Sequence, residues 1–288
     1  EGVPVASNGY TSDSTPQLSG TAAAGSLITI YNDGTAIGSV VAGGDGGWQY
    51  TPAALDDGSY ALSITETTPA GNVSPASAVT TINVDTQAPE AAQNVLVNNN
   101  EGSTLVPINS GDVTNDATPQ LIGSAEPGSV VLIYDGATQI GSVTVNSSGS
   151  WQFTTGALTQ GEHNLSTVVS DAAGNTSPAS PTITFTVDTV APAAATEIAL
   201  VNNNGATPQA ITSGSTTGDN TPEFSGRAEP GSTIVVSDGN LILGTTTTDA
   251  QGNWSFSPIL SDGPHSLSVT VTDAAGNSSA PGAPIAFT

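Results

Sequence analysis

A repeat of domain length constrains the fold of this chain more than any other feature. A step of 103 residues separates Trp48 from Trp151, and Trp151 from Trp254. The prolines of three Thr-Pro pairs and the glycines of three Gly-Ser pairs keep the same step, at Pro16, Pro119, Pro222, Gly25, Gly128 and Gly231. This period indicates domains in series and not a solenoid of short repeats. We expect three repeats, at residues 1–86, 87–189 and 190–288.

Each repeat has the pattern of short strands joined by turns. In repeat two, segments bounded by Gly, Pro, Asp and Asn predict strands at residues 118–125, 130–134, 140–145, 151–154, 164–170 and 182–187. The pair Asp135-Gly136 predicts a hairpin, and residues 171–175 (DAAGN) predict a loop. About seven short strands at regular spacing predict an all-β protein made of β-sandwiches.

The charge balance is extreme and excludes several kinds of partner. The chain has 25 acidic residues and a single basic one, Arg227, and its formal net charge is -24. Nucleic acids are bound by clustered Lys and Arg, so we expect no nucleic-acid partner. We also expect no membrane insertion, because no apolar run is long enough to span a bilayer. Acids without basic partners must be solvated or bound to cations.

The sequence offers no consistent catalytic set. The chain has no Cys and no Lys, which excludes thiol chemistry and a phosphate-binding loop with a lysine. Its two histidines, His163 and His265, lie in different repeats where repeat one has Tyr60, each in the pattern Gly-x-Tyr/His-x-Leu. We therefore expect no enzyme, and we expect these rings to be packed or hydrogen-bonded near the following strand.

The three tryptophans allow two interpretations. Each follows a Gly-rich turn and leads into a predicted strand. Packing in the core or at its rim is the structural interpretation, and a stacking platform for a sugar is the functional one. The sequence favours packing.

Several motifs together resemble a known family. They are (Asn/Asp)-x-Thr-Pro, Ala-Glu-Pro-Gly-Ser, Gly-x-Trp, Asp-Ala-Ala-Gly-Asn and Val-Asp-Thr-x-Ala-Pro. This set resembles the bacterial Ig-like repeats of giant type I-secreted adhesins, such as biofilm-associated proteins and the giant non-fimbrial adhesin of Salmonella. The resemblance implies three tandem Ig-like β-sandwich domains in a linear rod, with calcium at the domain junctions. Tyr60, His163 and His265 stand at a position that resembles the corner of Ig-like domains, where an aromatic ring tethers the chain.

Acidic residues at matching positions are the candidate ligands. In an Ig-like sandwich, the ends of the second and sixth strands and the incoming linker share one end of the domain. We expect two calcium sites, one at each junction, formed by Asp13, Asp85, Glu126 and Asp171, and by Asp116, Asp188, Glu229 and Asp273. Hard oxygen ligands without His or Cys favour Ca²⁺. The alternative is that each acid is a turn residue or solvated. Repeat one has Ala23 and Thr68 at two of these positions, so its own N-terminal end should lack such a site.

The leading functional hypothesis is structural. We expect a calcium-stiffened stalk segment of a secreted or cell-surface bacterial adhesin, excised from a longer chain. Its partners would be the neighbouring repeats and, through a distal region not present here, a host cell or surface receptor. The alternatives are an Ig-like module that itself binds a carbohydrate or host protein, and an accessory region of a secreted hydrolase. The similar length of the repeats favours the stalk.

Overall fold

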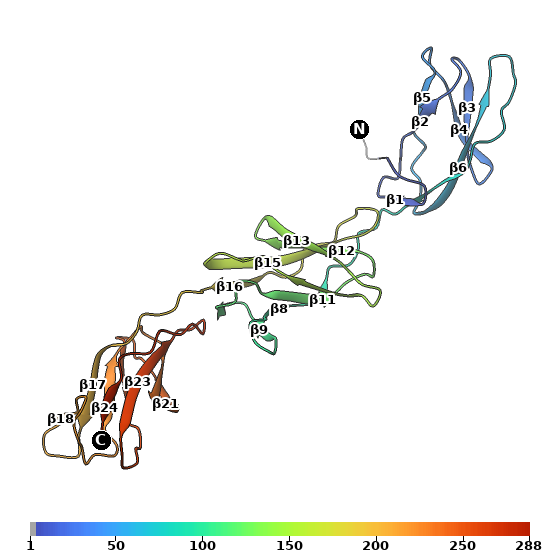
Figure 1. The fold of residues 1–288 in the computed structure, drawn as a ribbon. Coiled ribbons are helices and arrows are strands. Elements are labelled where there is room, and N and C mark those ends of the chain that lie inside the picture. The colour runs from blue at the N-terminus through green and yellow to red at the C-terminus, as the bar shows by residue number, and fades with distance from the viewer. Residues whose placement is uncertain (1–3) are drawn as a thin grey trace. The chain divides into compact units, whose positions relative to one another are not determined.

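The computed structural model describes residues 4–288, and its regular elements are all β-strands (Figure 1). The sequence prediction of an all-β protein is therefore confirmed. Across the described residues, no helix is long and apolar enough to cross a membrane. The strands of each repeat form two sheets, and each repeat is described separately below.

Repeat two has nine strands in two sheets (Figure 1). The five-stranded sheet has the order β10-β16-β15-β12-β13, and the four-stranded sheet has the order β14-β11-β8-β9. A short parallel pairing of β10 with β16 sets the edge of the larger sheet. In chain order the strands are β8 (Gln93–Asn99), β9 (Val106–Ile108), β10 (Val113–Thr114), β11 (Gln120–Ser124), β12 (Val130–Asp135), β13 (Thr138–Thr144), β14 (Ser150–Thr154), β15 (Gly161–Ser170) and β16 (Ile183–Val187).

Repeat three repeats this arrangement. Its sheets have the orders β21-β20-β23-β24 and β18-β17-β19-β22. Two backbone hydrogen bonds, between Thr217 and Thr288 and between Thr288 and Ser215, stand where β10 meets β16 in repeat two. The strands are β17 (Thr196–Asn202), β18 (Gln209–Ala210), β19 (Glu223–Arg227), β20 (Thr233–Asp238), β21 (Leu241–Thr247), β22 (Asn253–Phe256), β23 (His265–Thr272) and β24 (Ile285–Phe287).

Repeat one has the same large sheet but a smaller second one. The large sheet has the order β1-β7-β6-β3-β4, whereas the second contains only β2 and β5 in the part of the chain that is described. The strands are β1 (Gly9–Thr11), β2 (Leu18–Thr21), β3 (Leu27–Asn32), β4 (Thr35–Val41), β5 (Gly47–Tyr50), β6 (Gly58–Thr67) and β7 (Thr80–Val84). By the 103-residue step, the positions that correspond to β8 and β17 fall before residue 1 of this sequence.

The predicted strands of repeat two are present, and the hairpin at Asp135-Gly136 joins β12 to β13. The strands β8, β9 and β10, which precede the first predicted strand, were not predicted from the sequence. Runs of Asn end β8 and β17, and Asn favours turns over strands, which hid the apolar residues in front of them. Val97 of β8 and Leu200 of β17 are nevertheless buried in their repeats.

The tryptophans belong to the core. Trp48, Trp151 and Trp254 are 7%, 4% and 4% exposed, which confirms the packing interpretation. In repeat three the ring of Trp254 meets Phe224 edge-on, with 5.4 Å between the ring centroids. Rings buried in this way offer no face on which a sugar could stack.

Candidate functional site: the linker aspartate and the Asp-Ala-Ala-Gly-Asn loop

The loop at residues 171–175 is held by its first and last residues. The Oδ1 of Asp171 accepts hydrogen bonds from the backbone N–H groups of Ala173 and Asn175, each at 2.9 Å. The N–H of Asp171 donates to the carbonyl oxygen of Asn175 at 3.1 Å. Gly174 has a φ of 89°, a left-handed conformation that a glycine adopts without strain. The sequence prediction of a loop here is confirmed, and Asp171 is its turn residue.

Asn175 connects this loop to the linker that leads into repeat two. Its Nδ2 donates to the Oδ2 of Asp171 and to the backbone carbonyl of Asp85, both at 2.8 Å. The N–H of Asp85 in turn donates to the carbonyl of Thr11 at 3.0 Å, which continues the pairing of β1 with β7. The peptide groups on the two sides of one linker residue are therefore bonded to different repeats.

The second linker shows the same contacts. The Nδ2 of Asn277 donates to the carbonyl of Asp188 at 2.7 Å and to the Oδ2 of Asp273 at 2.9 Å. The N–H of Asp188 donates to the carbonyl of Thr114 at 2.9 Å. We call this arrangement the junction clamp: a linker aspartate whose N–H bonds the preceding repeat and whose carbonyl accepts from the loop asparagine. Because the same contacts recur at both linkers with nearly equal distances, the junction clamp is a regular feature of the repeat.

The side chains of the linker aspartates serve the linker itself. The Oδ1 of Asp85 accepts from the N–H of Gln87 at 3.1 Å, and the Oδ1 of Asp188 accepts from the N–H of Val190 at 3.0 Å. Both carboxylates thereby close a short turn before the Ala-Pro of the motif. Asp85 and Asp188 are only partly buried.

Asp116, another predicted ligand, is fully buried and bonded to the backbone. Its Oδ1 accepts from the N–H of Thr118 at 2.7 Å and its Oδ2 from the N–H of Asn100 at 2.9 Å. Asp219 of repeat three makes the same bonds, from Thr221 and Asn203. Asp219 was not among the predicted ligands, although the 103-residue step from Asp116 leads to it. In both repeats this aspartate fastens the end of the first strand.

The remaining predicted ligands are more exposed. Asp13, the counterpart of Asp116 in repeat one, is exposed and accepts from the N–H and hydroxyl of Thr15. Glu126 and Glu229 are exposed turn residues whose backbone carbonyls accept from Ser129 and Ser232. Within residues 4–288, no group of three or more His, Cys, Asp or Glu side chains is placed to hold a metal ion. A calcium ion at a clamp would need carbonyl oxygens and water to complete its ligands. Calcium stays a prediction.

Repeat one departs from the motif at Thr68, as the sequence showed. The N–H of Thr68 donates to the carbonyl of Asn72 at 2.9 Å, and the hydroxyl of Thr68 accepts from the N–H of Asn72 at 3.3 Å. The threonine hydroxyl therefore preserves the loop but removes the negative charge.

The corner position tethers the chain in all three repeats. The hydroxyl of Tyr60 donates to the carbonyl of Asp56, and the Nε2 atoms of His163 and His265 bond the carbonyls of Thr159 and Ser261. Each of these bonds is 2.8 Å long and spans four residues. The prediction that the two histidine rings are hydrogen-bonded near the following strand is confirmed.

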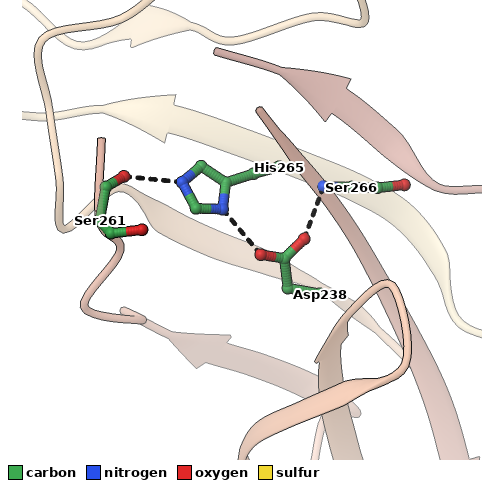
Figure 2. A network of polar contacts seen from close by, with 4 residues as sticks. All are labelled: Asp238, Ser261, His265 and Ser266. Atoms are coloured by element: carbon green, nitrogen blue, oxygen red, sulfur yellow. Dashed lines mark hydrogen bonds and ion pairs between the residues drawn. The ribbon is translucent and has the colours of Figure 1, made fainter. Parts of the chain in front are cut away.

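His265 has an acceptor at each ring nitrogen (Figure 2). Its Nδ1 lies 2.7 Å from the Oδ2 of Asp238, whose Oδ1 accepts from the N–H of Ser266 at 2.7 Å. The hydrogen bond to Asp238 and then that to the Ser261 carbonyl raise the pKa of His265 above 6.5. Desolvation raises the pKa of Asp238, but the bonds from His265 and Ser266 outweigh it and hold that pKa below 3.8. The structure therefore favours the imidazolium-carboxylate pair.

This pair is not arranged for nucleophilic catalysis. A small cleft of about 240 Å³ borders His265 and Ser261. The Nε2 of His265, which would have to accept a proton from a hydroxyl, is bonded to the backbone carbonyl of Ser261. The geometry is that of a structural tether.

The comparisons with known proteins identify the family. A family model described as "Bacterial Ig-like domain" matches residues 4–86, 94–189 and 197–288. These matches cover most of the chain, so the chain belongs to the bacterial Ig-like domain family. Ig-like domains are typically non-catalytic. None of the curated proteins compared matches the chain.

Several solved structures are similar to this chain at low identity. Fibronectin(III)-like modules of CbhA from Clostridium thermocellum are 19% identical, with 64% of this chain and 91% of that chain covered and a TM-score of 0.41. The FN1–FN3 domains of chicken CNTN1 are 12% identical, with 98% of each chain covered and a TM-score of 0.38. The BSP domain of a biofilm associated protein is 13% identical, with 98% of this chain and 61% of that chain covered and a TM-score of 0.25.

Proposed function

We propose that this chain is a stalk segment of an extracellular bacterial surface protein of the adhesin type, without catalytic activity. The observation that carries the proposal is the junction clamp, which is present at both linkers with the same residue types and contacts. A chain that only connects independent domains has no need to bond each linker residue on both sides.

The clamp supplies a physical reason for resistance to bending. Rotation of a repeat about its linker would break the bond from Asn175 to Asp85, or from Asn277 to Asp188. A hydrogen bond of this kind contributes about 1 kcal/mol net. Each clamp therefore limits bending modestly, and tandem repeats would add such limits along a longer protein.

The proposal also includes calcium binding at the junction clamps. The chain carries a net charge of -24, and each clamp already holds a carboxylate beside a linker carbonyl, both of them oxygen ligands of the type Ca²⁺ prefers. A bound ion would neutralise repulsion between the linker aspartate and the loop aspartate. We further propose export by type I secretion and folding outside the cell, where calcium is plentiful. The absence of cysteine suits that route.

Distance measurements between spin labels can test both parts. One label is placed on an exposed strand residue of repeat one and one on repeat two, in the full chain, with calcium and with chelator. We expect a narrow distance distribution with calcium and a broader one with chelator. Asn175→Ala should broaden the distribution in both conditions, because it removes the donor of the clamp. Asn72→Ala, which changes the corresponding loop of repeat one, is the matched control and should change nothing.

The variants separate the hydrogen bonds from the metal. The double variant Asp85→Ala with Asp171→Ala should lose the calcium response at the first junction, while a label pair across the second junction keeps it. Identical distance distributions with calcium and with chelator in the wild type would refute the calcium part of the proposal. The hydrogen-bonded clamp would then be tested by Asn175→Ala alone. If that variant is also unchanged, the stalk proposal itself fails.

A further inference from the structure

The loop after β17 contains an Asn-Gly pair, Asn204-Gly205. The chain has one other such pair, Asn8-Gly9. In an Asn-Gly pair the backbone nitrogen of the glycine can attack the side-chain carboxamide of the asparagine, because no Cβ on the glycine hinders the approach. Asn204 and Gly205 are both exposed, so water has access to this loop. The two pairs have the same composition, and their hydrogen bonds decide which is the more reactive.

The pairs differ in the freedom of the glycine nitrogen. The N–H of Gly9 donates to the carbonyl of Ala6 at 2.8 Å, and the N–H of Asn8 donates to the carbonyl of Thr81 at 2.7 Å. These bonds hold the first pair in a fixed turn. The N–H of Gly205 makes no hydrogen bond within residues 4–288. Since the attack requires this nitrogen to lose its proton and turn towards the side chain, Asn204-Gly205 is the more reactive pair.

The side chain of Asn204 belongs to the network around a buried aspartate. Its Nδ2 donates to the Oδ1 of Asp219 at 2.8 Å. The Oδ2 of Asp219 accepts from the N–H of Asn203 at 3.1 Å, just after β17 ends. Asp219 is only 3% exposed. The neutral amide of Asn204 is therefore one of the donors that satisfy a buried carboxylate at the end of β17.

Repeat two differs at this point of the network. The 103-residue step leads from Asn204 to Glu101, and among the described residues the side chain of Glu101 makes no bond to the buried Asp116. Repeat two thus carries a carboxylate at this position of the loop without contact to its buried aspartate. In repeat three the same position contacts Asp219, so a carboxylate there would face another carboxylate.

We propose that Asn204 is a site of spontaneous deamidation, which releases the end of β17. The nitrogen of Gly205 forms a bond to the Cγ of Asn204 and gives up its proton. The bond from Cγ to Nδ2 breaks, and Nδ2 leaves as ammonia. Water then opens the cyclic imide at one of its two carbonyl carbons, which yields aspartate or isoaspartate. The reaction consumes only water and adds one negative charge to the chain.

The product has the opposite effect on Asp219. It replaces a hydrogen-bond donor by a second carboxylate at close range, and the two negative charges repel each other. Because Asp219 is buried, solvent ions screen this repulsion poorly. The N–H of Asn203 then loses a fixed acceptor. Isoaspartate would in addition lengthen the backbone of the loop by one carbon atom.

Peptide mapping by mass spectrometry measures the reaction in the full chain, aged at mildly alkaline pH. We expect Asn204 to deamidate at least about tenfold faster than Asn8, which corresponds to a barrier lower by about 1.4 kcal/mol. The test variant is Gly205→Ala. A Cβ at this glycine would meet only the carbonyl oxygen of Thr207, at 3.7 Å, so the loop can keep its fold while the attack is hindered.

Gly205→Ala should slow the deamidation of Asn204 at least about tenfold and leave the rate at Asn8 unchanged. Deamidation of Asn204 that is no faster than that of Asn8 would overturn the proposal. An unchanged rate in Gly205→Ala would overturn it as well, because the attacking nitrogen would then not be that of Gly205.

Hydrogen exchange tests the release of β17. Asn204→Asp imitates the product, and the protection of the Asn203 N–H should fall at least about tenfold in this variant. Asn204→Ala removes the donor without adding a charge and should cause a smaller loss. Glu101→Gln changes the charge at the corresponding position of repeat two and should leave the protection of the Asn100 N–H unchanged. Equal protection of the Asn203 N–H in the wild type and in Asn204→Asp would show that deamidation does not release the strand.

Discussion

At the scale of single residues, the repeats show different side chains doing one job. Tyr60, His163 and His265 bond the same backbone position. The acceptor beside the ring changes with the ring. In repeat one, the N–H of Ala61, which follows Tyr60, donates to Asn32. In repeat three, the N–H of Ser266, which follows His265, donates to Asp238. A neutral pair and a pair able to carry charge therefore occupy the same site.

The His265 and Asp238 pair should make stability depend on pH. The raised pKa of His265 contributes stability that is complete below pH 6.5 and is lost as the pH rises through the folded-state value. The lowered pKa of Asp238 contributes stability that is present above pH 3.8 and is lost as the pH falls through its folded-state value. The pair should stabilise most between these limits. NMR titration of the His265 ring should give a pKa above 6.5 that falls in Asp238→Asn.

The control is the double variant His265→Tyr with Asp238→Asn, which installs the residues of repeat one. The thermal unfolding temperature of this variant, relative to that of the wild type, should rise as the pH is raised from about 5 to about 8.5. Only the wild type loses a charged pair over this range. His163 is present in both proteins and cancels from the comparison. A constant difference across this pH range would contradict the assigned charge state.

At the scale of elements, close approach between strands and the tryptophan ring restricts the sequence. Gly226 of β19 faces Trp254 of β22. A Cβ added at Gly226 would lie 2.9 Å from the carbonyl oxygen of Thr196 and 2.9 Å from the Trp254 ring. The glycine therefore allows β17 and the ring to pack on the same strand.

Gly226→Ala should destabilise repeat three by about 1–3 kcal/mol, the usual cost of overpacking a well-packed core. Urea unfolding followed by hydrogen exchange in β19 and β22 measures the effect. Gly218→Ala is the matched control, since a Cβ there meets nothing within 4 Å, and its effect should stay within about 0.5 kcal/mol. A Gly226→Ala protein as stable as the control would show that the strands can separate at little cost.

At the scale of the whole chain, the repeats bury unequal numbers of hydrophobic residues. Among the described residues, repeat three buries eleven hydrophobic residues around Phe224 and Trp254, whereas repeat one buries seven, four of them in a cluster around Trp48. Less apolar area removed from water means less stabilisation, at about 25 cal/mol for each Å².

Repeat one should therefore unfold first on heating. We expect its transition at least about 5 °C below that of repeat three, since about 1 kcal/mol shifts the midpoint of a domain of this size by that amount. Hydrogen exchange at increasing temperature, resolved by peptides from β3 and β20, measures the order. Earlier exposure of β20 than of β3 would contradict the expectation.

The sequence alone determined the class of the fold, the number of repeats and the role of local motifs. The 103-residue step and the strand pattern led to three tandem Ig-like domains, and Asp171 and His265 lie in the loop and the tether expected of them. Features of this kind depend on residues close together in the chain, whose spacing can be read directly. The two calcium sites stay predictions.

Only the tertiary structure decided which distant groups meet. Asn175 reaches the carbonyl of Asp85 across 90 residues, and Asp116 bonds the N–H of Asn100 inside repeat two. The bonded partner in both cases is a backbone group, which no side-chain pattern marks. The strand β8 was hidden for a related reason: its Asn-rich end suggests a turn until Asp116 is seen to satisfy it.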